Sequence, residues 1–198
     1  MENNNEVVTD RLEQAIERQK AFLLQKQLVP VGPAADASPL DISITVKDDI
    51  ESVLLSNDES YSLSVIEDSG IKVEIVAQTF QGARHGLETL FQLMDWDQER
   101  ETFLIVDSVQ ISDSPYYPHR GIMVDTSRNF ISVAKIKEVI SSLSFSKMNV
   151  FHWHLTDSHS FPLLLDSHPE MADYGAYRGD MIYTKEDMRE VNRFATER

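Results

Sequence analysis

The sequence predicts a protein of mixed α and β structure in two parts, a small α+β block followed by a parallel βαβ unit. The block before Pro115 alternates short β-like runs with amphipathic helical patterns. Beyond it, two apolar runs, Ile122 to Val124 and Met148 to Leu155, each end in a polar cluster. Apolar residues at helical spacing lie between these runs, which indicates a strand, a helix and a second strand.

The N-terminal residues predict a helix and then a linker. We expect the helix over residues 9–28, capped by Thr9 and stopped by Pro30. Residues 29–39 carry prolines among small residues, which is typical of a loop. Residues 1–38 are therefore expected to form an N-terminal helix and linker. The apolar stripe of the helix consists of Leu12, Ala15, Ile16 and Leu23.

Residues 39–115 are expected to form a small α+β domain. The clearest helix of the chain starts near Ala83, where apolar residues recur at i, i+3, i+4, i+7, i+8 and i+11. The segment from Phe103 to Ile111 predicts one further strand or two short ones. Three β-like runs precede the helix: Ile42 to Val46, Tyr61 to Ile66 and Ile71 to Ala77.

Residues 116–198 begin with the βαβ unit. A crossover helix forces its two strands to be parallel, so their carboxyl ends lie at one edge of a sheet. Parallel α/β folds place their chemistry at that edge. Arg128 and Asp157 follow the two strands and are therefore expected to look into the same cleft. A second helix is predicted after Thr184, which forms a capping box with Asp187.

Bulk composition excludes some functions. The chain has 198 residues, a formal charge of −15 and no cysteine. So large an acidic excess argues against binding duplex nucleic acid or an anionic membrane surface, because both require clustered Lys and Arg. Disulfides and thiolate metal sites are excluded. The polar, acidic N-terminus does not have the pattern of a signal peptide.

Several motifs carry a resemblance to a known family. The runs HRGIMVDTSRNF (residues 119–130) and KMNVFHWHLTDSHSFP (residues 147–162) resemble the opening of the catalytic barrel of glycoside hydrolase family 20, the β-N-acetylhexosaminidases. Upstream, FQGARHGLETLFQL (residues 80–93) and DESYSLSV (residues 58–65) resemble a helix and a strand of the family's small domain. Asn129 and the Thr-Asp-Ser tripeptide are closer to arthropod members than to vertebrate lysosomal ones.

The resemblance implies a fold. The expectation is a small α+β domain followed by the start of a (β/α)8 TIM barrel. Such a barrel takes about 250 residues, whereas residues 119–198 hold about two βα units. The barrel is therefore expected to be truncated after those two units, so that the chain is an N-terminal fragment.

The resemblance also implies an activity. The family removes terminal N-acetylglucosamine or N-acetylgalactosamine from glycans or chitin oligosaccharides with retention of configuration, and the substrate's own acetamido oxygen is the nucleophile. An aspartate of the protein orients the acetamide, and the adjacent glutamate protonates the leaving oxygen. No Asp-Glu pair of this sequence follows a predicted barrel strand. The fragment alone is therefore expected to be inactive.

The family also implies partners and a location. The expected ligand is a glycan or chitooligosaccharide that ends in an N-acetylhexosamine, and no cofactor is expected. Full-length members are often dimeric. They are secreted or lysosomal, so an N-terminus without a signal peptide departs from the family, and the natural start of the protein is expected to lie elsewhere.

Two site residues are carried over from the family motifs. Arg128 matches the arginine that binds hydroxyls of the terminal sugar, for which a planar guanidinium is suited. Asp157 matches an aspartate that supports the catalytic acid by pairing with a histidine, which lies outside this chain. The alternative for Arg128 is a surface ion pair with Asp125 or Asp157. The alternative for Asp157 is a turn or capping aspartate.

Other readings stay open. A metal-dependent barrel hydrolase would use His152 and His154 as ligands, since two histidines one residue apart point the same way from a strand. The favoured interpretation is that both are packed histidines and that no metal is bound. A non-catalytic glycan-binding or interaction module would use the small domain alone. Core packing is the preferred interpretation for Trp96 and Trp153. For His85 the preferred interpretation is packing of the small domain against the barrel.

Overall fold

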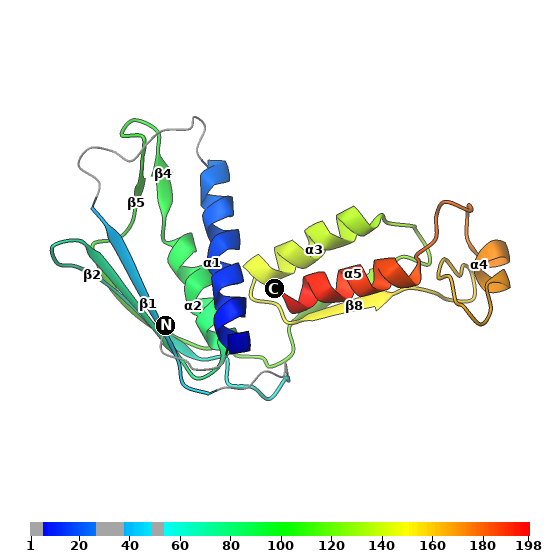
Figure 1. Cartoon of the computed structure of the whole chain (residues 1–198), viewed down its shortest axis with the longest axis horizontal. Helices are drawn as coiled ribbons and strands as arrows, with labels where there is room; N and C mark the ends of the chain where they lie inside the picture. Colours follow the sequence, from blue (N-terminus) through cyan, green and yellow to red (C-terminus); the bar gives the residue numbers. More distant parts are fainter. Residues whose placement is uncertain (1–5, 27–37, 49–53) are drawn as a thin grey trace. The chain divides into compact units, whose positions relative to one another are not determined.

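The computed structural model describes residues 6–26, 38–48 and 54–198, which divide into two compact units (Figure 1). The first unit spans residues 1–118 and the second residues 119–198. Most of the linker expected at residues 29–39 lies outside the described residues. None of the described helices combines the length and the apolar content needed to cross a membrane.

The first unit is built on a four-stranded sheet of order β1-β3-β2-β6. Strand β3 pairs in parallel with β1 and antiparallel with β2, and β2 pairs antiparallel with β6. A separate two-stranded ribbon, β4 with β5, precedes β6. The strands are β1 Leu40–Val46, β2 Tyr61–Glu67, β3 Ile71–Ala77, β4 Asp95–Asp97, β5 Thr102–Leu104 and β6 Ser108–Asp113.

One face of this sheet carries the core of the unit. Alternation along each strand turns every second side chain to that face. Strand register then lines up Ile44, Ile75, Leu63 and Ile111 as one apolar row across the four strands. Figure 1 shows the helices α1 (Glu6–Lys26) and α2 (Phe80–Gln92) lying side by side on one side of the sheet. Burial of these rows is the main stabilising term of the unit.

Helix α1 belongs to the same core. It begins at Glu6, so the predicted cap at Thr9 is wrong, because Thr9 already lies inside the first turns of the helix. Its stripe of Val8, Leu12, Ala15 and Leu23 packs into the apolar cluster of the sheet and α2. The amide Nε2 of Gln19 also donates to Oε2 of Glu88 on α2, at 2.5 Å.

Helix α2 approaches the sheet closely because two glycines face it. A Cβ atom on Gly82 would lie 2.4 Å from the carbonyl oxygen of Ser60, and one on Gly86 would lie 2.7 Å from Cγ2 of Ile75. The helix start is fixed by Thr79, whose hydroxyl accepts from the Gly82 amide and donates to the carbonyl oxygen of Asp58. His85 is buried within this unit.

The second unit contains the predicted parallel βαβ arrangement. Strand β7 (Gly121–Asp125) pairs in parallel with β8 (Val150–His154), and α3 (Val133–Phe145) connects them. The predicted capping box of Thr184 and Asp187 is present and starts α5 (Lys185–Thr196). The ring of Trp153 contacts that of Tyr183. In the first unit, the ring of Trp96 contacts that of Phe103.

The core of the second unit lies between these strands and their helices. Ile136 and Ile140 of α3 pack with Tyr183 and Val191, and Phe151 and Trp153 of β8 join them. A short helix that the sequence did not predict, α4 (Glu170–Gly175), lies in the connection from β8 to α5. Its single buried apolar residue, Ala172, gives no periodic signal.

Substitution of Gly82 by alanine is expected to destabilise the first unit by about 1–3 kcal/mol, because the new methyl group meets backbone that cannot move aside. Helix propensity alone would favour alanine by about 1 kcal/mol, so the sign of the change is diagnostic. Urea unfolding of the purified chain measures it.

Two further variants serve as controls. Gly86→Ala should cost less, since the atom that it meets, Cγ2 of Ile75, belongs to a side chain and not to the backbone. Gly179→Ala should change little, because no atom lies within 4 Å of its Cβ position. A Gly82 variant as stable as the parent chain would contradict the close approach of α2 to Ser60.

Candidate functional site

The carboxyl ends of β7 and β8 meet at one edge of their sheet. Asp125 and His154, the last residues of the two strands, are partners in register. One residue further on, the Thr126 amide donates to the carbonyl oxygen of His154 at 2.9 Å. The polar turns that follow the strands therefore start from a common, fixed position.

The turn after β7 is organised by Asp125. Its Oδ1 atom accepts hydrogen bonds from the amides of Ser127 (3.1 Å) and Arg128 (3.0 Å). This is an Asx-type turn, in which a carboxylate replaces a backbone acceptor. The arrangement fixes the main chain on the amino side of Arg128.

The turn after β8 is organised by Asp157 in the same way. Its Oδ1 atom accepts from the amides of His159 (2.6 Å) and Ser160 (3.2 Å). The hydrogen bond from the His159 amide, the largest cause, holds the pKa of the Asp157 carboxyl well below its usual range. Its side chain is only 16% exposed. The carboxylate is therefore charged throughout the neutral and mildly acidic range.

Arg128 lies between the two carboxylates. Its Nε atom is 3.4 Å from Oδ2 of Asp157 and 3.6 Å from Oδ2 of Asp125, and its side chain is 64% exposed. Within the described residues, all of its side-chain ion pairs and hydrogen bonds involve Nε. The terminal nitrogens Nη1 and Nη2 are therefore left as donors for a ligand, while the contacts of Nε with the two carboxylates orient the guanidinium.

The ion-pair interpretation of Arg128 is present in this geometry, because the arginine pairs with Asp125 and Asp157. The sugar-binding interpretation stays a prediction. An exposed ion pair contributes little stability by itself, so the pairing is better understood as orientation of the guanidinium.

Three side-chain hydrogen bonds to other segments brace the turn after β7. The Ser127 hydroxyl donates to the carbonyl oxygen of Ser160 at 2.9 Å, which ties the two turns together. The Tyr177 hydroxyl donates to the carbonyl oxygen of Arg128 at 3.0 Å. Trp153 Nε1 donates to the Thr126 hydroxyl at 2.8 Å.

Tyr183 supports the same loop from inside the core. Its hydroxyl donates to the carbonyl oxygen of Ile131 at 2.6 Å and accepts from the amide of that residue at 3.1 Å. Its ring stacks on Phe130 and meets the edge of Trp153. Burial raises the pKa of the Tyr183 phenol. The sequence offered no sign of these braces, since isolated hydroxyl residues in loops have no periodicity.

The metal-site alternative rested on His152 and His154, of which His152 is exposed in this structure rather than packed. The rings of His152 and His154 have centroids 6.3 Å apart. Among the described residues, the group with metal-ligand spacing is Asp125, His154 and Asp157, whose ligand atoms lie within 4.8 Å of one another. His152 is not part of it, and the Arg128 guanidinium is the cation that already faces both carboxylates.

No Asp-Glu dipeptide follows β7 or β8. The one Asp-Glu dipeptide of the sequence, Asp58-Glu59, lies before β2 in the first unit. The Asp58 carboxylate accepts from the Ser60 amide, and Glu59 lies 3.6 Å from the buried His85 ring. These contacts indicate a structural role for the dipeptide within the first unit.

Comparison with known families matches nearly the whole chain. A family model described as "Glycosyl hydrolase family 20, catalytic domain" matches residues 117–198. A second, described as "beta-acetyl hexosaminidase like", matches residues 2–93. The chain belongs to glycoside hydrolase family 20. The family 20 catalytic-domain match contains the turns of Arg128 and Asp157.

Family 20 relatives come from insects and from vertebrates. A chitooligosaccharidolytic beta-N-acetylglucosaminidase of Bombyx mori is 42% identical over 194 residues, covering 96% of this chain and 32% of the relative. Beta-hexosaminidase subunit beta of Mus musculus is 41% identical over 155 residues, covering 78% of this chain and 28% of the relative. The chain thus spans a third or less of these proteins.

Solved structures of family 20 enzymes share the fold. The chitobiase of Flavobacterium johnsoniae superposes with a TM-score of 0.75 at 32% identity, covering 94% of this chain and 28% of that one. An exo-β-N-acetylglucosaminidase of Vibrio harveyi, solved with N-acetylglucosamine, gives a TM-score of 0.71 at 26% identity, covering 95% of this chain and 30% of that one.

Replacement of Asp157 by asparagine is expected to destabilise the second unit at neutral pH. The depressed pKa means that the charged carboxylate stabilises the fold above the pKa of the unfolded chain, about 3.9. That contribution is lost as the pH falls toward the folded-state pKa. The difference between the parent and Asp157→Asn should therefore be constant above about pH 5 and shrink below about pH 4.

Thermal unfolding across this pH range measures the effect. Asp180→Asn is the matched control, because Asp180 also has a lowered pKa but sits in an exposed pair with Arg178. Its effect should be small at every pH. An equal effect of the two substitutions would show that the charge of Asp157 contributes no more stability than that of an exposed aspartate, because asparagine keeps an oxygen that can accept the amide hydrogen bonds.

Proposed function

We propose that this chain is the N-terminal part of a β-N-acetylhexosaminidase. Residues 1–38 form its N-terminal helix and linker, residues 39–115 its small α+β domain, and residues 116–198 the start of its TIM barrel. In this assignment β7 and β8 are the first two barrel strands, followed by α3 and α5. The parallel register of β7 and β8 supports it, because every barrel strand of the fold is parallel to its neighbours.

The proposed activity is removal of a terminal, non-reducing N-acetylglucosamine or N-acetylgalactosamine. The substrate is a glycan or a chitooligosaccharide, and the chitooligosaccharidolytic relative of Bombyx mori supports the second. Hydrolysis proceeds with retention, through attack by the acetamido oxygen of the substrate. The complete protein is proposed to be secreted or lysosomal, and dimeric.

Arg128 is proposed to bind hydroxyls of the terminal sugar. The observation that carries this role is the geometry of its guanidinium, anchored at Nε by two carboxylates with both terminal nitrogens left for a ligand. Two parallel N–H donors match two hydroxyl oxygens on neighbouring ring carbons, which fixes the orientation of the ring as well as its position. The sugar is thereby held for reaction at its other side.

Asp157 is proposed to support the catalytic acid from a distance. Its Oδ2 atom lies 3.4 Å from Nε of Arg128 and 4.0 Å from Nε2 of His154. A charged aspartate paired with a histidine raises the basicity of that ring and fixes its orientation. The amide hydrogen bonds that keep Asp157 ionised are what make it suitable for this role.

The 198-residue chain alone is expected to lack hexosaminidase activity. The described residues place no Asp-Glu pair at a barrel-strand end, so the groups that orient the acetamide and protonate the leaving oxygen are absent from this site. A chromogenic N-acetylglucosaminide incubated with the purified chain tests this. Turnover at a normal enzymatic rate would overturn the assignment of these groups to other residues of the protein.

In the complete enzyme, Arg128→Lys keeps the positive charge but loses the fork. Each charge-assisted hydrogen bond contributes about 1.5–3 kcal/mol. Losing one or two should lower kcat/KM by about tenfold to several thousandfold. The melting temperature should change little, because the exposed ion pairs of Arg128 contribute little stability. Steady-state kinetics and thermal unfolding of the same variant provide both values.

Arg178→Lys is the matched control for this substitution. Arg178 is equally exposed, at 64%, and is paired with Asp180. It should have parental kinetics. Parental kinetics in the Arg128 variant would remove Arg128 from the site, whereas a large fall in melting temperature would favour a structural role.

A further inference from the structure

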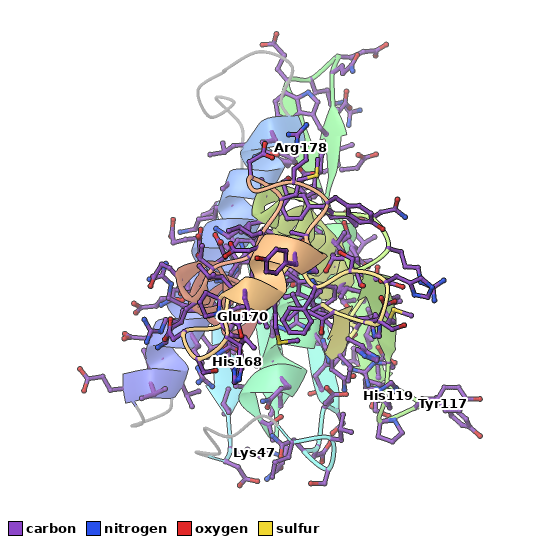
Figure 2. The ribbon with its side chains drawn as sticks, turned by 90° about the vertical axis from the view of Figure 1, so that its right-hand side faces the viewer. Lys47, Tyr117, His119, His168, Glu170 and Arg178 are labelled. Carbon is purple, nitrogen blue, oxygen red and sulfur yellow. The ribbon has the colours of Figure 1, made fainter. Side chains whose placement is uncertain are left out.

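Tyr177 lies in the loop that leaves α4 and leads to α5. Figure 2 labels Arg178 in this loop, together with Glu170 at the start of α4 and His168 just before it. The Tyr177 hydroxyl donates to the carbonyl oxygen of Arg128 across 49 positions of sequence, and the residue is 57% exposed. An exposed tyrosine rarely needs a backbone partner, since water can serve its hydroxyl. The bond therefore calls for an explanation.

The loop that carries Tyr177 is itself held against the turn of Asp157. The Phe161 amide donates to the carbonyl oxygen of Gly175 at 2.9 Å. A Cβ atom on Gly175 would lie 2.8 Å from that of Phe161, so the two segments touch at a position where only glycine fits. Tyr177 is thus tied at its base to the turn after β8 and at its tip to the turn after β7.

The consequence for Arg128 is a main chain that is fixed on both sides. Its amide donates to Oδ1 of Asp125, and its carbonyl oxygen accepts from Tyr177. The Nε atom is held by the carboxylates of Asp125 and Asp157. Tyr177 supplies the one restraint on the carbonyl side of the residue among these contacts.

We propose that Tyr177 is a positioning residue for sugar recognition, acting through Arg128. This inference rests on the proposed function, in which the Arg128 fork binds hydroxyls of the terminal sugar. A bidentate contact needs both donors in place at once, and an error of about 1 Å in such a group can cost about a hundredfold in rate. Fixing the backbone of a long, exposed arginine reduces the freedom that binding would otherwise have to remove.

The chain provides a matched control for this role. Tyr174, on α4, is 91% exposed, and its hydroxyl makes no hydrogen bond within the described residues. Removing its hydroxyl changes the same chemical group in the same segment without touching Arg128. A general effect of losing a tyrosine hydroxyl near the site would appear in both variants.

The test is a double-mutant cycle in the complete enzyme. Tyr177→Phe keeps the ring and removes the hydrogen bond, so kcat/KM for a chromogenic N-acetylglucosaminide should fall about two- to twelvefold, the range expected for one neutral hydrogen bond. Tyr174→Phe should remain within about twofold, as expected for an exposed residue without a specific partner. In the Arg128→Lys background, Tyr177→Phe should cause no further loss, because its effect passes through the missing fork. All variants are assayed below their melting transitions.

The outcomes separate this inference from the proposed function. Parental kinetics for Tyr177→Phe, alongside an impaired Arg128→Lys, would overturn the positioning role alone. Losses that multiply in the double variant would overturn the route through Arg128. An inactive complete protein, or an Arg128→Lys variant with parental kinetics, would overturn the proposed function and the inference with it.

Discussion

The parallel pairing of β7 with β8 is the constraint on which the site depends. Because both strands run the same way, their ends at Asp125 and His154 coincide, and residues 29 positions apart in sequence become neighbours. An antiparallel pair would place the two turns at opposite ends of the sheet. The covering helix α3 and the core around Ile136 and Tyr183 keep the strands in this register. The packing of the unit therefore determines the geometry of its site.

The turns that follow β7 and β8 have the same hydrogen-bonding pattern, and together they place two carboxylates and one guanidinium at the ends of the strands. In each, an aspartate accepts backbone amides with Oδ1 and presents Oδ2 to Arg128. The amide hydrogen bonds that shape the turn after β8 also lower the pKa of the Asp157 carboxyl. The site is held mainly by backbone and hydroxyl contacts, which leaves the terminal nitrogens of Arg128 for a ligand.

The sequence alone predicted the elements whose signal is local. Alternation from Ile71 to Ala77 and the stripe starting at Ala83 each depend on neighbouring residues, and both elements are confirmed. Proximity of Arg128 and Asp157 followed from the crossover rule. Tyr177 and Ser127 were missed, because their bonds join loops 49 and 33 positions apart. Helix α4 was missed because one buried residue makes no pattern. The roles of Arg128 and Asp157 came from family resemblance and remain proposals.

The phenol of Tyr183 makes the two hydrogen bonds that a backbone peptide group of a neighbouring strand would make. It gives one hydrogen bond to Ile131 and takes one from it, as a residue of an adjacent strand would. Tyr174 and Tyr177 of this unit are exposed, whereas the ring of Tyr183 is fully buried. Since burial raises its pKa, the folded unit retains this proton in alkali after an unfolded chain would have released it. Tyrosinate absorbance therefore makes Tyr183 an intrinsic optical marker of whether the loop behind the site is in place.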